Sequence, residues 1–108
     1  MVQPAIIDGV KKYLNKLSET GLAVNFGIVF GSYATGCATK DSDIDLIVVS
    51  SDFDNSISRD QIKKLWHIAA RVDSRIEPVP CGRLQWQNDV SSAIIEAART
   101  EGQTVYLA

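Results

Sequence analysis

Two short groups of residues in the first half of the chain have the types and spacing needed for phosphoryl chemistry. Gly31 and Ser32 follow the apolar run 28–30, so they lie where a strand ends, and the backbone N–H groups and hydroxyl of such a turn can bind an anion. Asp43 and Asp45 are two residues apart, which places both carboxylates on one face of a strand. Carboxylate oxygens are ligands that suit Mg²⁺. The pattern predicts a site that holds metal ions beside phosphate groups.

A Gly-Ser pair, ten intervening residues and Asp-Ile-Asp together resemble the signature of the DNA polymerase β-like nucleotidyltransferases. The matching positions are Gly31, Ser32, Asp43 and Asp45, and Gly36, Ser42 and Leu46 also resemble the small, single-domain branch, the minimal nucleotidyltransferases. The resemblance implies an α/β (α+β) fold in which a small mixed β-sheet has helices packed against it.

The resemblance also implies a reaction: a nucleoside monophosphate passes from ATP or another nucleoside triphosphate to an acceptor hydroxyl, and pyrophosphate leaves. Two Mg²⁺ ions would be bridged by Asp43 and Asp45, and Glu77 is the matching candidate for the third metal-binding and catalytic carboxylate. Family members often have Asp at this third position, so a structural surface glutamate is the alternative for Glu77. Gly31 and Ser32 would contact the phosphates, and the alternative for Ser32 is a helix N-cap.

Members of the minimal branch commonly pair with a separate helical protein of the HEPN type and act as its antitoxin by adenylylating it. We therefore expect a nucleotidyltransferase that modifies a protein partner within a toxin–antitoxin pair. One alternative is a catalytically weak or inactive domain that neutralises its partner by binding alone. Another is nucleotidyl transfer to a small molecule such as an aminoglycoside, which would need a pocket at a homo-oligomer or heteromer interface.

Composition limits the possible partners and compartments. With 108 residues, the chain is expected to form a single domain over residues 1–108. The net charge is −2 and Lys and Arg are spread along the sequence, so duplex nucleic acid is not favoured as a partner. The chain has neither a long apolar run nor a signal peptide, which predicts a cytoplasmic protein without a membrane partner. Cys37 and Cys81 are expected to be free thiols.

The first half of the chain predicts a helix, a strand, a short helix and a second strand. A helix should begin near Pro4 and end at Gly21, and its apolar stripe comprises Ile6, Val10, Tyr13, Leu14 and Leu17. A buried strand is predicted over 23–30. A short helix should open at Gly31 and stop at Gly36, and the second strand should cover about 43–49.

The second half predicts two more helices and two more strands. After a surface loop over 50–58, Ser58 and Gln61 have capping-box spacing, and the helix that follows carries the stripe Ile62, Leu65, Trp66, Ala69 and Val72. Residues 75–79 predict an edge strand closed by two prolines. Asn88 or Asp89 is expected to cap a helix that carries Val90, Ile94, Ile95 and Ala98, and 104–107 predicts a last strand.

Five other residues are weaker candidates for the site. His67 is predicted to be a surface residue, Trp66 fits the core stripe better than a base-stacking role, and Trp86 lies in a loop with no assigned element. Asp41 is expected in a solvated turn. Lys40 is a lesser candidate for a phosphate contact.

Overall fold

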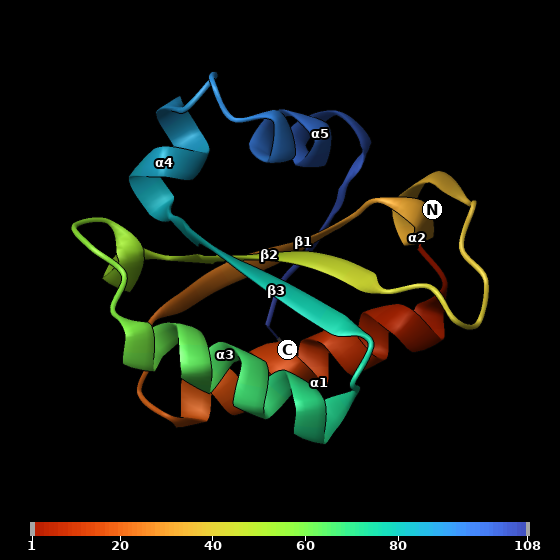
Figure 1. Ribbon diagram of the computed structural model, residues 1–108, viewed down its shortest axis with the longest axis horizontal. Helices are drawn as coiled ribbons and strands as arrows, with labels where there is room; N and C mark the ends of the chain where they lie inside the picture. Colours follow the sequence, from red (N-terminus) through yellow and green to blue (C-terminus); the bar gives the residue numbers. More distant parts are fainter. Residues whose placement is uncertain (1, 108) are drawn as a thin grey trace.

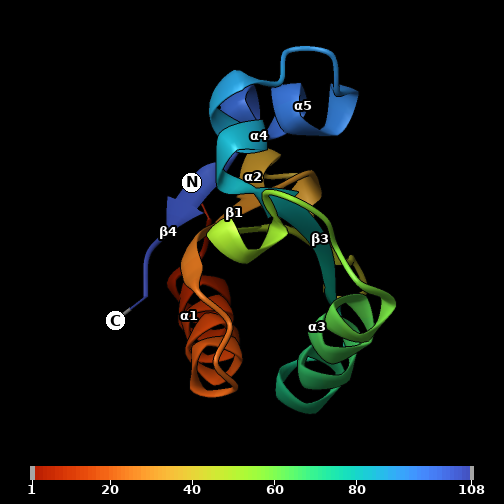
Figure 2. The same cartoon turned by 90° about the vertical axis from the view of Figure 1, so that its left-hand side faces the viewer.

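The computed structural model describes residues 2–107, and its helices enclose a four-stranded sheet on both faces. In chain order the elements are α1 (Pro4–Glu19), β1 (Val24–Phe30), α2 (Ser32–Thr35), β2 (Ile44–Ser50), the 3₁₀ helix η1 (Ser51–Phe53), α3 (Arg59–Val72), β3 (Ile76–Gly82), α4 (Arg83–Asn88), α5 (Ala93–Glu101) and β4 (Gln103–Val105). Figures 1 and 2 show α1 and α3 on one face of the sheet and α4 and α5 on the other. The predicted α+β fold is confirmed.

The sheet is mixed, and its strand order is β3-β2-β1-β4. β1 pairs antiparallel with both β2 and β4, whereas β2 pairs parallel with β3 after the crossover through α3. On β2, the side chains of Ile44, Leu46 and Val48 are buried beneath α1 and α3, and those of Ile47 and Val49 pack on the α5 side. A strand covered on both faces is apolar almost throughout, as this one is.

Helix α1 forms as its sequence predicts. Pro4 occupies the first turn, and all five residues of the predicted stripe are buried. The Tyr13 hydroxyl donates to the Leu65 carbonyl at 2.9 Å, which joins α1 to α3, and burial raises the Tyr13 pKa. This buried hydrogen bond adds a directional contact to the apolar packing between the two helices.

Helix α3 begins as predicted but buries a narrower stripe. The capping box is present: the Gln61 N–H donates to the Ser58 hydroxyl at 3.1 Å, and the Ser58 N–H donates to the Gln61 side chain at 2.8 Å. Leu65 and Ala69 are buried, but Trp66 is 46% exposed.

The predicted α3 stripe is therefore wrong on one side. Ile62 is 39% exposed, and Ile68, on the opposite flank, packs on the core instead. Positions 62 and 66 are four residues apart, so they share one flank of the helix, and this flank points away from the core.

Strand β3 runs farther than predicted. The expected end at the prolines is wrong, because the strand continues through Pro78 and Pro80 to Gly82. The two prolines are two residues apart, so their missing N–H groups fall on the same side of the strand. β3 is an edge strand, as predicted, and that side is the unpaired outer edge, where a proline interrupts no ladder.

The segment after β3 departs most from prediction. Residues 83–88 form α4, which was not predicted, so Trp86 lies on a helix. Ser92, not Asn88 or Asp89, caps α5, because the Asp89 carboxylate accepts hydrogen bonds from the N–H and hydroxyl of Ser91 at 2.8 Å each. Two of the four predicted helix residues, Ile95 and Ala98, are buried, while Val90 and Ile94 are 80% and 48% exposed.

Three smaller differences remain. The predicted loop 50–58 starts inside β2, since Ser50 is a buried strand residue, and Phe53 of η1 is buried as well. The last strand is shorter than predicted and shifted, covering Gln103–Val105.

In the part of the chain that the structure describes, no helix is long and apolar enough to cross a membrane.

Candidate active site

The three predicted carboxylates come from adjacent positions of the sheet. Asp45 on β2 is paired with Phe30 of β1 on one side and Glu77 of β3 on the other, and Asp43 directly precedes β2. Strand alternation places Asp43, Asp45 and Glu77 on one face, the same face as Ile47, whose side chain packs against the α5 side of the sheet. The acidic residues therefore lie at the end of the sheet near α2, on the α4–α5 face (Figure 1).

Two of the three carboxyl groups have their pKa raised by burial and by neighbouring charge. Partial burial and the charge of Asp43 raise the pKa of Asp45. The pKa of Glu77 is raised by partial desolvation, by the charges of Asp43 and Asp45 and by a side-chain hydrogen bond with Asp43. Carboxyl groups whose pKa is raised by neighbouring carboxylates lie where a cation would be stabilised.

The acidic residues are not drawn together around a single point. Within residues 2–107, no three side chains of His, Cys, Asp or Glu converge closely enough to be ligands of one metal ion. The donor set itself, three carboxylates from adjacent strand positions, is the hard-oxygen set that Mg²⁺ prefers.

Gly31 is required by the site itself. Its backbone has φ 73° and ψ −148°, a region that is essentially restricted to glycine. A Cβ atom at this position would overlap an oxygen of the Asp45 carboxylate. The sequence predicted a phosphate contact at Gly31, whereas the structure shows that glycine at this position also makes room for the Asp45 carboxylate.

Ser32 is not the N-cap that was considered as its alternative role. Gly31 occupies the N-cap position of α2, and Ser32 is the first helical residue. No hydrogen-bond partner of the Ser32 hydroxyl is found among residues 2–107, and the side chain is half-buried. Gly36 ends α2 in the left-handed conformation, as predicted.

A hydrogen-bond network that the sequence did not reveal holds α2 against the start of β3. The Arg75 guanidinium donates to the Tyr33 hydroxyl at 3.0 Å and to the Asp73 carboxylate, and the Tyr33 hydroxyl donates to the Thr39 carbonyl at 3.2 Å. The Arg75 hydrogen bond lowers the pKa of Asp73. Tyr33 and Arg75 are 42 residues apart, so no local spacing could have predicted their contact.

The loop before Asp43 is held by a turn of its own. The Thr39 N–H donates to the Ser42 hydroxyl at 2.9 Å, and the Ser42 N–H donates back to the Thr39 carbonyl at 3.1 Å. Lys40 and Asp41 at the tip are exposed, as expected for Asp41 in a solvated turn. Lys40 lines a cavity of about 290 Å³ together with Tyr33 and Arg75, beside α2.

Comparison with known proteins identifies the family. Residues 8–98 match the family model of the nucleotidyltransferase domain. The chain belongs to the nucleotidyltransferase family. The resemblance carried by Gly31, Ser32, Asp43 and Asp45 is therefore confirmed, and the chain is an enzyme of the nucleotidyltransferase class. A comparison with curated proteins gave no match.

Several solved structures share the fold of this nucleotidyltransferase. A toxin–antitoxin complex with AMP-PNP has a TM-score of 0.62 at 20% identity, over 91% of this chain and 73% of that one. A tri-AMPylated Shewanella oneidensis HEPN toxin in complex with its MNT antitoxin gives 0.55 at 18% identity, over 91% and 70%. A nucleotidyltransferase from Sulfolobus solfataricus described as putative gives 0.57 at 16%, over 75% and 70%.

The two tryptophans and the histidine of this nucleotidyltransferase lie outside the acidic site. Trp66 belongs to α3, across the sheet from Asp45, so it cannot stack on a nucleotide bound beside that carboxylate. Trp86 packs edge-on against Phe26, with ring centroids 6.2 Å apart, and its carbonyl accepts a hydrogen bond from Arg99. His67 is exposed, as predicted.

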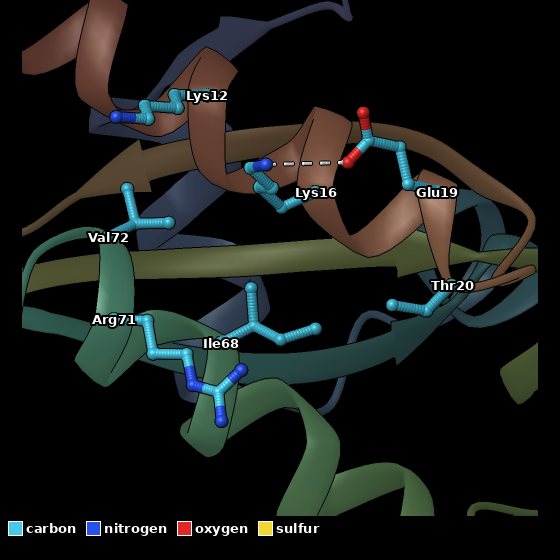
Figure 3. A pocket seen from close by; sticks show the side chains of 7 residues that line it. All are labelled: Lys12, Lys16, Glu19, Thr20, Ile68, Arg71 and Val72. Atoms are coloured by element: carbon cyan, nitrogen blue, oxygen red, sulfur yellow. Dashed lines mark ion pairs between the residues drawn. The ribbon is translucent and has the colours of Figure 1, made fainter.

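A groove between α1 and α3 is also separate from the acidic site. Figure 3 shows Lys12 and Lys16 on one wall and Arg71 on the other, around Ile68. The groove encloses about 500 Å³, and none of the five predicted site residues lines it. The nucleotidyltransferase therefore has an acidic site on one face of its sheet and a basic groove on the other.

Proposed function

We propose that this nucleotidyltransferase transfers an adenylyl group from ATP, with Mg²⁺, to a hydroxyl group of a protein partner, as the antitoxin of a HEPN/MNT-type pair. The observation that carries the metal and nucleotide part is the placement of Asp43, Asp45 and Glu77 on one face beside Gly31 and Ser32. The partner part is supported by the fold shared with a toxin–antitoxin complex that holds AMP-PNP and with a complex of a HEPN toxin and an MNT antitoxin.

Each residue has a role in this proposal. Asp43 and Asp45 would hold two Mg²⁺ ions, and Glu77 would complete the set from β3 and accept the proton of the attacking hydroxyl. Bound Mg²⁺ would supply Lewis-acid stabilisation of charge on the phosphates and on the attacking oxygen. The Ser32 hydroxyl and the backbone N–H groups at the start of α2 would bind the β- or γ-phosphate.

The reaction makes one bond and breaks one bond. The acceptor oxygen bonds to the α-phosphorus of ATP, and the bond from that phosphorus to the bridging oxygen of pyrophosphate breaks. The hydroxyl proton passes to the Glu77 carboxylate and then to solvent. In-line geometry requires the acceptor oxygen to approach the α-phosphorus from the side opposite the leaving pyrophosphate.

Nucleotide binding is the first experiment. ATP is titrated into wild type, Asp43→Asn and Asp45→Asn by calorimetry, with and without Mg²⁺. We expect binding only with Mg²⁺ and only in wild type, because asparagine keeps the shape of aspartate but removes the charge that holds the metal. Binding by both variants at wild-type affinity would overturn the assignment of Asp43 and Asp45.

Transfer is tested separately with ATP labelled at the α-phosphate. The protein is co-expressed with the product of a neighbouring gene for a helical protein, and label on that partner is expected with ATP and Mg²⁺ present.

The lack of convergence among the acidic side chains favours one second candidate, a domain that neutralises its partner by contact alone. Neutralisation that survives Asp43→Asn with Asp45→Asn would establish that second function and reject the first.

A further inference from the structure

The fold separates charge between its two layers, although Lys and Arg are spread along the sequence. Helices α1 and α3 carry seven of the eleven Lys and Arg residues and only three of the thirteen Asp and Glu residues. This layer therefore has a net charge of +4, and the remainder of the chain has −6. Figure 2 shows α1 and α3 on the face of the sheet opposite α4 and α5, so the positive layer lies opposite the acidic site.

The outer flank of α3 adds an apolar surface to this positive layer. Ile62, Trp66 and Ala70 recur every four residues, so they form a stripe along the flank opposite the groove. Trp66 is 46% and Ile62 39% exposed, and Trp66, Ala70, Lys63 and His67 line an open hollow of about 520 Å³. An exposed tryptophan in an apolar stripe is typical of an interaction surface.

The charges on α3 limit which kind of partner surface could bind to this flank. The helix carries Arg59, Lys63, Lys64 and Arg71 against the single acid Asp60, and none of the ion pairs found among residues 2–107 includes an α3 residue. If a second copy of the chain docked through the same flank, the cations beside one stripe would lie near those of the other copy. Repulsion between two positively charged surfaces makes such a dimer unfavourable. An apolar stripe bordered by unpaired cations fits an apolar stripe bordered by carboxylates.

We propose that the outer flank of α3, formed by Ile62, Trp66 and Ala70 with Arg59 and Lys63 at its border, docks an amphipathic helix with acidic borders from the protein partner. The inference rests on the proposed function for the source of that helix. Trp66 is the apolar anchor, and the two cations select the acidic border. The partner would then be held on the face opposite the acidic site, and the reacting end of the sheet stays open.

The test selects peptides without assuming a partner. A displayed library of helical peptides with randomised border positions is selected against wild-type protein, and a synthetic copy of the dominant peptide is titrated into variants. We expect Asp and Glu at the selected borders and an apolar stripe between them. Trp66→Ala should weaken binding by about tenfold or more, and Lys63→Glu should weaken it further at low salt.

A matched control and a second measurement keep the outcomes distinct. Leu84 on α4 is 57% exposed, and Leu84→Ala should change peptide affinity less than about twofold. Selected peptides that bind Trp66→Ala as tightly as wild type, or selection of basic borders, would overturn the proposal. So would a Trp66-dependent homodimer in sedimentation.

Binding of ATP with Mg²⁺ is measured on the same variants. It should be unchanged by Trp66→Ala, and its loss in a folded variant would reassign Trp66 to the nucleotide site and reject docking. Loss of ATP binding by the wild type, with peptide docking intact, would instead reject the proposed transfer activity and leave the docking surface standing.

Discussion

Gly31 is the residue at which the fold and the site depend on the absence of a single methyl group. Its φ of 73° with ψ −148° excludes other residues, and a Cβ atom would meet the Asp45 carboxylate. We expect Gly31→Ala to lower the free energy of unfolding by about 1–3 kcal/mol and to abolish Mg²⁺-dependent ATP binding. Urea unfolding and calorimetry measure the two effects.

Gly36 provides the matched control for that substitution. It also has a positive φ of 79°, but nothing lies within 4 Å of its added Cβ. Gly36→Ala should therefore cost about 1–2 kcal/mol of backbone strain and leave ATP binding intact in the folded protein. Equal losses of ATP binding in both variants would show that strain in the turn, and not the approach to Asp45, explains the need for glycine.

The two free cysteines should differ sharply in reactivity. Cys37 is exposed, whereas Cys81 is buried, and burial raises the pKa of the Cys81 thiol to about 11. At pH 8 only about one Cys81 thiol in a thousand is ionised, and the thiolate is the reactive form. Alkylation followed by mass spectrometry should show one rapid modification of native protein and a second only in denaturant. Two rapid modifications of the native protein would contradict this.

The Tyr33 hydroxyl connects α2, the 36–43 loop and the segment just before β3. Tyr33→Phe removes the acceptor of Arg75 and the donor to Thr39, and should cost about 1 kcal/mol of stability. It should also weaken ATP binding, because α2 carries Ser32. Hydrogen exchange is expected to rise in residues 36–43.

Tyr106→Phe serves as the control for the Tyr33 variant, since Tyr106 is 65% exposed. It should leave stability within about 0.5 kcal/mol of wild type and change no exchange rates in the loop. Exchange in 36–43 that is unaltered by Tyr33→Phe would mean that the turn between Thr39 and Ser42 suffices to order the loop.

The elements also show which parts of the structure were predictable. Local signals sufficed for α1 and for the Ser58 capping box, because a stripe or a cap involves residues within a few turns. The spacing of Gly31, Ser32, Asp43 and Asp45 is likewise local. Prediction failed where the contacts are made with distant parts of the chain: the spacing of Trp66 fits the core stripe, but which flank of α3 faces the sheet depends on tertiary packing.

The same limit applies to the continuation of β3 and to the network around Arg75. Pro78 and Pro80 end a strand only if both of its edges are paired, and strand order is not a local property. Glu77 was predicted from the family resemblance, but its position opposite Asp45 depends on the parallel register of β2 and β3. Arg75 gave no signal in the sequence because its partner Tyr33 is distant along the chain.

The raised pKa values of Asp45 and Glu77 lower the free energy of unfolding of the whole protein as pH rises. A carboxyl whose pKa is raised in the folded state binds protons more readily there than in the unfolded chain. Asp45 and Glu77 are such groups, so their penalty is absent below the unfolded pKa values near 4 and grows as pH rises through the folded values. Asp73 acts in the opposite sense: its lowered pKa contributes stability above pH 4 that is lost as pH falls further.

Asp45→Asn should therefore stabilise the metal-free protein in a pH-dependent way. At pH 7 we expect a melting temperature about 1–3 °C above wild type, small because solvent screens a partly exposed carboxyl, and no difference at pH 3, where Asp45 is protonated in both states. Mg²⁺ should raise the melting temperature of wild type at pH 7 but not that of the variant. Asp41→Asn, in the exposed turn, is the control and should match wild type throughout. A variant less stable than wild type at pH 7 would show that the Asp45 carboxylate supports the fold, and the repulsion argument would then be wrong.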